Sequence, residues 1–147
     1  LDASLIGGGG KVLQVVGATD NSLRSTTSTS FVTGSNTLTV DITPSATSSK
    51  ILVFVQTNGY HTAGLDGCFT IFRDSTDLGG GVAGLLLSQF GVSGAGQAGV
   101  SLMVLDSPSS TSALTYQMYF RVQSGSYTVE TGQSDMKSSI IAMEIGA

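Results

Sequence analysis

Apolar and polar residues alternate along several short stretches of the chain, most regularly between Leu114 and Val122. The apolar positions of this stretch are Leu114, Tyr116, Met118, Phe120 and Val122, and the positions between them are Thr115, Gln117, Tyr119 and Arg121. A period of two predicts a β-strand with one apolar and one polar face. The preceding segment, Asp106-Ser-Pro-Ser-Ser, has the composition of a turn, because proline fixes φ and aspartate and serine bond nearby backbone groups.

The same pattern, or a short apolar run between turn residues, predicts further strands at 11–17, 36–43, 50–56, 68–73, 86–90, 100–105, 127–130 and 138–145. Lys50 to Gln56 (KILVFVQ) has no polar face, which predicts a central strand covered on both sides. Asn58-Gly59 predicts a turn, with a loop over 60–65, and the glycine-rich segment 79–99 predicts a long loop around one short strand. With turn signals at roughly ten-residue spacing and no helical period, the sequence predicts an all-β antiparallel sandwich of jelly-roll type with about eight strands.

Four consecutive glycines, Gly7 to Gly10, mark the predicted domain boundary. Residues 1–10 are interpreted as a glycine-rich linker or N-terminal arm, and 11–147 as one sandwich domain. Because the chain begins at Leu1 and not at methionine, we expect it to be the C-terminal part of a longer protein.

Few residues are charged: 11% of the chain, against about 25% in an ordinary soluble domain. A surface this weakly charged predicts that part of the apolar surface is covered by another copy of the chain, in a homo-oligomer. The candidates for the subunit interface are residues of strands that are apolar on both faces, together with two residues of the polar face at 115–121. They are Val12, Val15, Ile51, Val53, Val55, Tyr119 and Arg121.

The net charge of −4 and six scattered basic residues argue against nucleic acid as a partner. No apolar run approaches the roughly 20 residues that span a bilayer, so membrane insertion is not expected, and no signal peptide is recognisable. Cys68 stands alone, which excludes an internal disulfide, and its strand-like surroundings predict a small buried side chain. Assembly in a reducing cytoplasm is consistent with this.

Candidate chemistry is sparse. His61 is the single histidine; it could act with Asp66 as a metal ligand or general base, or with Tyr60 as a carbohydrate contact at a loop tip, and the plainer interpretation is an exposed loop histidine without a task. Asp74 and Asp77 could form a carboxylate pair, but they lie in a turn where aspartate is favoured for backbone reasons. The glycine runs match no phosphate-binding fingerprint. We therefore expect no enzyme, no metal and no cofactor.

Several segments, taken in order, carry a family resemblance: KVLQVV, TPSATSSKILVFV, FTIFRDSTDLG, LDSPSSTSALTYQMYFRV and SSIIAMEIGA. Together they resemble virion proteins of tailed bacteriophages, many from marine and cyanobacterial hosts, in which such a domain closes the C-terminus of a fibre or projecting protein. The resemblance implies a trimeric β-sandwich, assembled in the host cytoplasm and displayed on the virion.

Two roles follow from that resemblance. In the first, the domain is a fibre or receptor-binding tip on a fibre shaft and contacts a host-surface glycan or protein through the loops near Tyr60, His61 and Asp66 and over 79–99. In the alternative, it is a capsid decoration protein, a cement or head-fibre protein bound to the major capsid protein. A polysaccharide-degrading enzyme would need a carboxylate pair in a groove, for which the sequence offers poor candidates.

Overall fold

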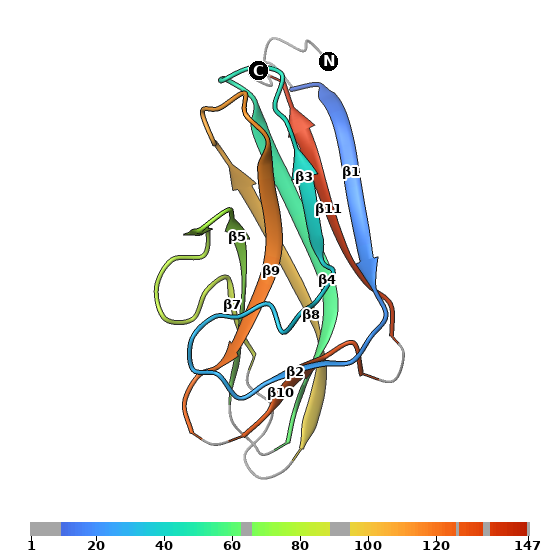
Figure 1. The fold of residues 1–147 in the computed structure, drawn as a ribbon, viewed down its shortest axis with the longest axis vertical. Helices are drawn as coiled ribbons and strands as arrows, with labels where there is room; N and C mark the ends of the chain where they lie inside the picture. Colours follow the sequence, from blue (N-terminus) through green and yellow to red (C-terminus); the bar gives the residue numbers. More distant parts are fainter. Residues whose placement is uncertain (1–9, 63–65, 89–94, 126, 134–135, 147) are drawn as a thin grey trace, which may run out of the picture.

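The chain folds into two antiparallel β-sheets that pack face to face (Figure 1). The structure is a computed structural model that describes residues 10–62, 66–88, 95–125, 127–133 and 136–146. Its strands are β1 (Val12–Asp20), β2 (Arg24–Thr26), β3 (Thr39–Ile42), β4 (Lys50–His61), β5 (Gly67–Arg73), β6 (Thr76–Asp77), β7 (Leu86–Ser88), β8 (Gly96–Asp106), β9 (Leu114–Val122), β10 (Val129–Thr131) and β11 (Ser138–Ile145). We call the sheet of β1, β2, β4, β8, β10 and β11 the β4 sheet, and the sheet of β3, β5, β6, β7 and β9 the β9 sheet.

Three pairs of these strands are the halves of longer, interrupted strands. β10 and β11 follow one another along the same edge of β4, and β2 and β1 pair with them in the same succession. β6 and β7 both pair with β5. When each pair is counted as one, the eleven described strands become eight, ordered 1-8-3-6 in the β4 sheet and 2-7-4-5 in the β9 sheet. Two four-stranded sheets with this order form a jelly roll, so the predicted fold is confirmed.

The core lies between the two sheets and is made of the inward-facing residues of both. Leu114–Val122 forms β9 with the predicted bounds, and all five of its apolar positions are buried. Phe120 of β9 stacks on Phe69 of β5, with the ring centroids 6.2 Å apart. The alternation of apolar and polar residues was therefore enough to predict which face of β9 points toward the β4 sheet.

The longest strand, β4, continues through the predicted turn at Asn58-Gly59. Gly59 pairs with Ala98 and Thr131, and a Cβ atom at this position would lie 3.0 Å from the ring of Phe69. Glycine at this position therefore allows the two sheets to pack closely, which is a common reason for a glycine inside a strand. The turn prediction was wrong because the residues after Gly59 continue to pair on both edges of β4.

Two buried carboxylates fix the strand ends. Asp106, at the end of β8, accepts hydrogen bonds from Arg73 Nη1 (2.7 Å) and Tyr116 Oη (2.6 Å). Glu144 Oε1 accepts bonds from the backbone N–H and the hydroxyl of Ser45 and from Ser49 Oγ, each at 2.7 Å. These bonds, those of Ser45 first, outweigh burial and lower the pKa of Glu144 to about 2. The carboxylate thus holds the turn between β3 and β4 against β11.

Candidate interaction surface

The outer face of the β4 sheet carries the largest group of exposed apolar side chains in the described part of the chain. Strand pairing places these side chains in two neighbouring rows across four strands. One row holds Val15, Met143, Leu52 and Leu105, and the other holds Ile141, Phe54 and Met103, with Gly17 at its β1 end. We call these seven side chains the apolar face.

Four side chains of the apolar face are exposed within the described chain, and the other three, Leu52, Phe54 and Met143, are half-buried. Met103 is 65% exposed, Val15 56% and Leu105 53%, although the residues next to them on the same strands point into the core. None of the seven side chains is charged. Contiguous exposed apolar patches are uncommon on soluble domains, and where they occur they usually mark an interaction site.

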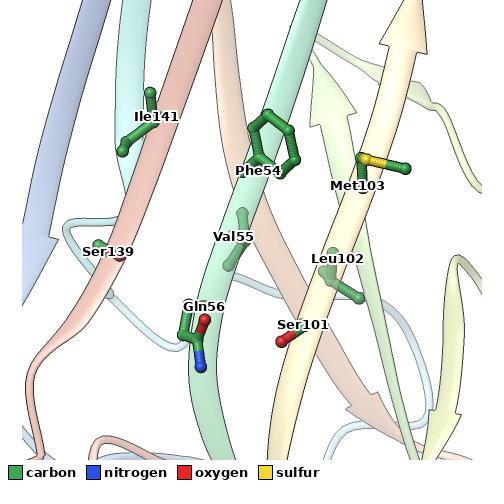
Figure 2. Close-up of a pocket in the computed structure, with 8 residues that line it drawn as sticks. All are labelled: Phe54, Val55, Gln56, Ser101, Leu102, Met103, Ser139 and Ile141. Carbon is green, nitrogen blue, oxygen red and sulfur yellow. The ribbon is translucent and has the colours of Figure 1, made fainter.

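A shallow hollow of about 430 Å³ adjoins the second row of the apolar face. Figure 2 shows Phe54 of β4 between Ile141 of β11 and Met103 of β8. The next row along the same strands consists of Ser139, Gln56 and Ser101, whose shorter or polar side chains leave the surface lower there. The surface therefore combines apolar ridges with a depression bordered by hydrogen-bonding groups, a pattern typical of protein interfaces.

Of the predicted interface residues, those on β4 were assigned to the wrong face. Ile51, Val53 and Val55 are at most 2% exposed and form part of the core between the sheets. Their neighbours Leu52 and Phe54 point outward instead. The run KILVFVQ correctly indicated a strand that is apolar on both faces, but a continuous run does not reveal which alternate set faces the core.

The β1 candidates lie on the exposed side of the molecule. Val12 and Val15 are 54% and 56% exposed, and Val15 belongs to the apolar face. The sequence analysis missed Met103, Leu105, Ile141 and Met143, although the apolar residues at alternate positions of 100–105 and 138–145 carried the signal.

Tyr119 and Arg121 lie on the outer face of the β9 sheet, on the opposite side of the sandwich. Arg121 is 8% exposed. Its Nη1 donates to the carbonyl oxygens of Thr29 and Val122, and its Nη2 donates to that of Val82. Its guanidinium lies 5.1 Å from the ring centroid of Phe31. The prediction that Arg121 contacts a neighbouring subunit is corrected, because the chain itself surrounds this side chain.

Tyr119 is half-buried and stacks on Phe72, with ring centroids 4.1 Å apart. Phe72 in turn meets the ring of Phe31 edge-on at 6.1 Å. Three aromatic rings therefore lie together on the outer face of the β9 sheet, next to Arg121.

The predicted receptor-contact residues do not form a loop tip. Tyr60 and His61 belong to β4 and pair with β8 and β10, and His61 is fully buried, with its ring stacked 6.4 Å from Tyr127. The interpretation of His61 as an exposed loop histidine was therefore wrong, and so was its use as a receptor contact. Asp66 precedes β5, and its carbonyl oxygen accepts hydrogen bonds from Tyr127 Oη and Gln123 N. The loop residues 63–65 and 89–94 lie outside the described residues.

The carboxylates considered for catalysis are engaged in turns. Asp77 Oδ1 accepts bonds from Thr70 Oγ1 and Gly79 N, and Asp74 Oδ1 accepts one from Thr115 N. Within the described ranges, no group of three or more His, Cys, Asp or Glu side chains is placed to hold a metal ion. Cys68 is buried as predicted, and burial raises the pKa of its thiol. The described part of the chain contains no helix that is long and apolar enough to cross a bilayer.

No protein-family model matches the chain, and no curated protein matches it. Among solved structures, the chain is similar to the crystal structure of the infectious bursal disease virus VP2 subviral particle, with a TM-score of 0.36 and 13% sequence identity. The match covers 91% of this chain and 38% of the VP2 chain. The chain therefore spans well under half the length of that viral protein.

Proposed function

We propose that this domain is a structural protein of a phage virion, displayed as a homotrimeric fibre or receptor-binding tip. The observation that carries the proposal is the apolar face: seven uncharged apolar side chains in register across four strands of a jelly roll. A soluble chain exposes such a surface at the cost of aggregation unless a partner covers it. Assembly is therefore the task that its surface chemistry fits best.

A second copy of the chain is the partner that best fits the apolar face. The chain carries a net charge of −4, and an uncharged face is the part of its surface where two copies meet without like-charge repulsion. The four strands are 8 to 12 residues long and about 4.8 Å apart, which gives the whole outer face around the apolar face a flat area of roughly 600 Å². That area approaches the roughly 800 Å² per partner of a standard stable interface. The number of three subunits comes from the family resemblance.

A second role, capsid decoration, uses the same observation with a different partner. A flat, uncharged sheet face also suits the surface of a capsid shell, to which a small single domain would add stability. The two roles differ in where the domain sits on the particle, and both need the apolar face to be covered.

Cryo-electron microscopy of the intact particle, with an antibody fragment raised against this domain as a marker, tests the proposal. The fibre role predicts density at the ends of projecting fibres with three copies around one axis. Density spread over the capsid shell would replace the fibre role by decoration. Absence of the domain from purified particles would overturn the virion role altogether.

A further inference from the structure

The outer face of the β9 sheet carries a second hollow, of about 470 Å³, on the opposite side of the sandwich from the apolar face. Phe31 and Phe72 line it, together with Ser30, Val82 and Arg121. Both rings are half-buried, and contact with each other and with Tyr119 fixes their orientation. The hollow therefore offers rigid aromatic surface beside hydroxyl and backbone groups, the usual composition of a site for a small ligand.

Arg121, which lines this hollow, forms no ion pair within the described residues. The other two arginines form ion pairs, Arg24 with Asp20 and Arg73 with Asp106. In the described part of the chain, Arg121 donates to carbonyl oxygens: its Nη1 to those of Thr29, Val122 and Gln123, and its Nη2 to that of Val82. A guanidinium held in place without a carboxylate partner lends the hollow a positive field, which attracts an anionic group.

We propose that this hollow binds a sugar ring that bears a carboxylate, as in an acidic polysaccharide of the host surface. The apolar face of the ring packs on Phe31 and Phe72, its hydroxyls bond Ser30 and nearby backbone groups, and its carboxylate lies toward Arg121. A small inorganic anion would leave the aromatic surface unused, and a neutral sugar would leave the charge unmatched. The inference rests on the proposed receptor-binding role and moves the contact from the predicted site at Tyr60, His61 and Asp66 to the opposite sheet.

Val82 allows a test that does not disturb the fold. It lines the hollow and is 77% exposed, so a charged side chain there is tolerated and changes the field at the site. Val82→Glu and Val82→Lys are compared with the wild-type chain by isothermal titration calorimetry, with a galacturonic acid trisaccharide and a neutral galactose trisaccharide as probes. Leu23→Glu, at an exposed position between β1 and β2, makes the same charge change on the other edge of the sandwich.

We expect the acidic trisaccharide to bind the wild-type chain and to bind Val82→Glu about fivefold more weakly, because one unit charge about 4 Å away in a watery site changes affinity by about that factor. Val82→Lys should bind it more tightly by a similar factor, and Leu23→Glu should match the wild type. Equal affinity in all four chains, or equal binding of the neutral trisaccharide, would overturn the inference. So would the absence of acidic trisaccharide binding at millimolar concentration. None of these results changes the position of the domain on the particle, which tests the proposed function separately.

Discussion

On the outer face of the β4 sheet Met103 is 65% exposed, whereas on the outer face of the β9 sheet Thr70 is fully buried. Both residues point away from the core between the sheets. Thr70 is covered because the segment between β6 and β7 folds back over β5: Leu78 and Leu85 donate backbone bonds to Ile71 and Phe69. The β4 sheet presents its seven apolar side chains without such a cover in the described residues.

The difference is the basis on which we propose two separate tasks for the two outer faces. The β9 sheet is completed by its own chain, so its outer residues can hold a fixed arrangement of aromatic rings around Arg121. The described chain leaves the apolar face uncovered. We therefore propose assembly for the β4 sheet and recognition for the β9 sheet.

The largest expected effect is the loss of assembly on introducing a charge into the apolar face. Met103→Glu would place a carboxylate at the interface between two copies, where its desolvation is costly. The mass measured by size-exclusion chromatography with light scattering should fall to about one third of the assembled value, with unchanged circular dichroism. Val82→Glu introduces the same charge on the other sheet and should leave the mass unchanged. Equal masses for the two variants would remove the distinction between the two faces.

Removing the charge that organises the β9 sheet should reduce stability without dissociating the assembly. Arg121→Met leaves the carbonyl oxygens of Thr29 and Val82 without their buried donor, at an expected cost of about 2 to 4 kcal/mol in the free energy of unfolding. Urea denaturation measures this cost. A loss below about 0.5 kcal/mol would show that Arg121 is solvated and that the chain does not complete this face.

A smaller change should loosen the segment that covers β5. Gly84 has a φ of +68°, and a Cβ atom there would lie 2.8 Å from the carbonyl oxygen of Phe69. Gly84→Ala should therefore cost about 2 to 3 kcal/mol through backbone strain and overpacking. Gly81→Ala is the matched control, because φ is +74° and the space around it is open, so only the strain of about 1 kcal/mol remains. Equal costs measured by urea denaturation would show that the segment does not pack on β5.

The smallest expected effect is on the stability of the fold at acidic pH. The hydrogen bonds to Glu144 hold its pKa at about 2, below the ordinary 4.5, so the carboxylate stabilises the fold fully above pH 4.5. This contribution is lost as the pH falls from 4.5 toward 2, because protonation then weakens the bonds from Ser45 and Ser49. Glu144→Gln should lower stability near pH 7 by about 1 kcal/mol and flatten the acid limb of a denaturation profile. Glu130→Gln, at the other glutamate, should leave that limb as steep as in the wild type.

Periodicity predicted the sheets well, because every residue of a strand contributes to the signal. The bounds of β9 and β11 agree with the predicted stretches, and the apolar positions of β9 are all buried. The prediction was wrong where it relied on a single dipeptide and not on a pattern that extends along a strand. Asn58-Gly59 indicated a turn, but packing of Gly59 against Phe69 overrode this local preference and carried His61 into the core.

The interaction surface was predictable only in part. The low charge and the strands that are apolar on both faces indicated that part of the surface is covered. Which face of β4 points into the core, however, depends on the residues that the other sheet presents. The arrangement around Arg121 could not be predicted at all, since Phe31, Phe72 and Val82 come from three segments that only the tertiary fold brings together.

The most direct test of the assembly claim compares the oxidation of two methionines in the native protein. Within a single chain Met103 is 65% exposed and Met136 is 42% exposed, so a bare apolar face lets Met103 react at least as fast as Met136 with dilute hydrogen peroxide. If another copy covers the apolar face, peptide mass mapping should show sulfoxide forming at Met103 about tenfold more slowly than at Met136. Faster oxidation of Met103 at concentrations where light scattering shows an assembly would contradict the account.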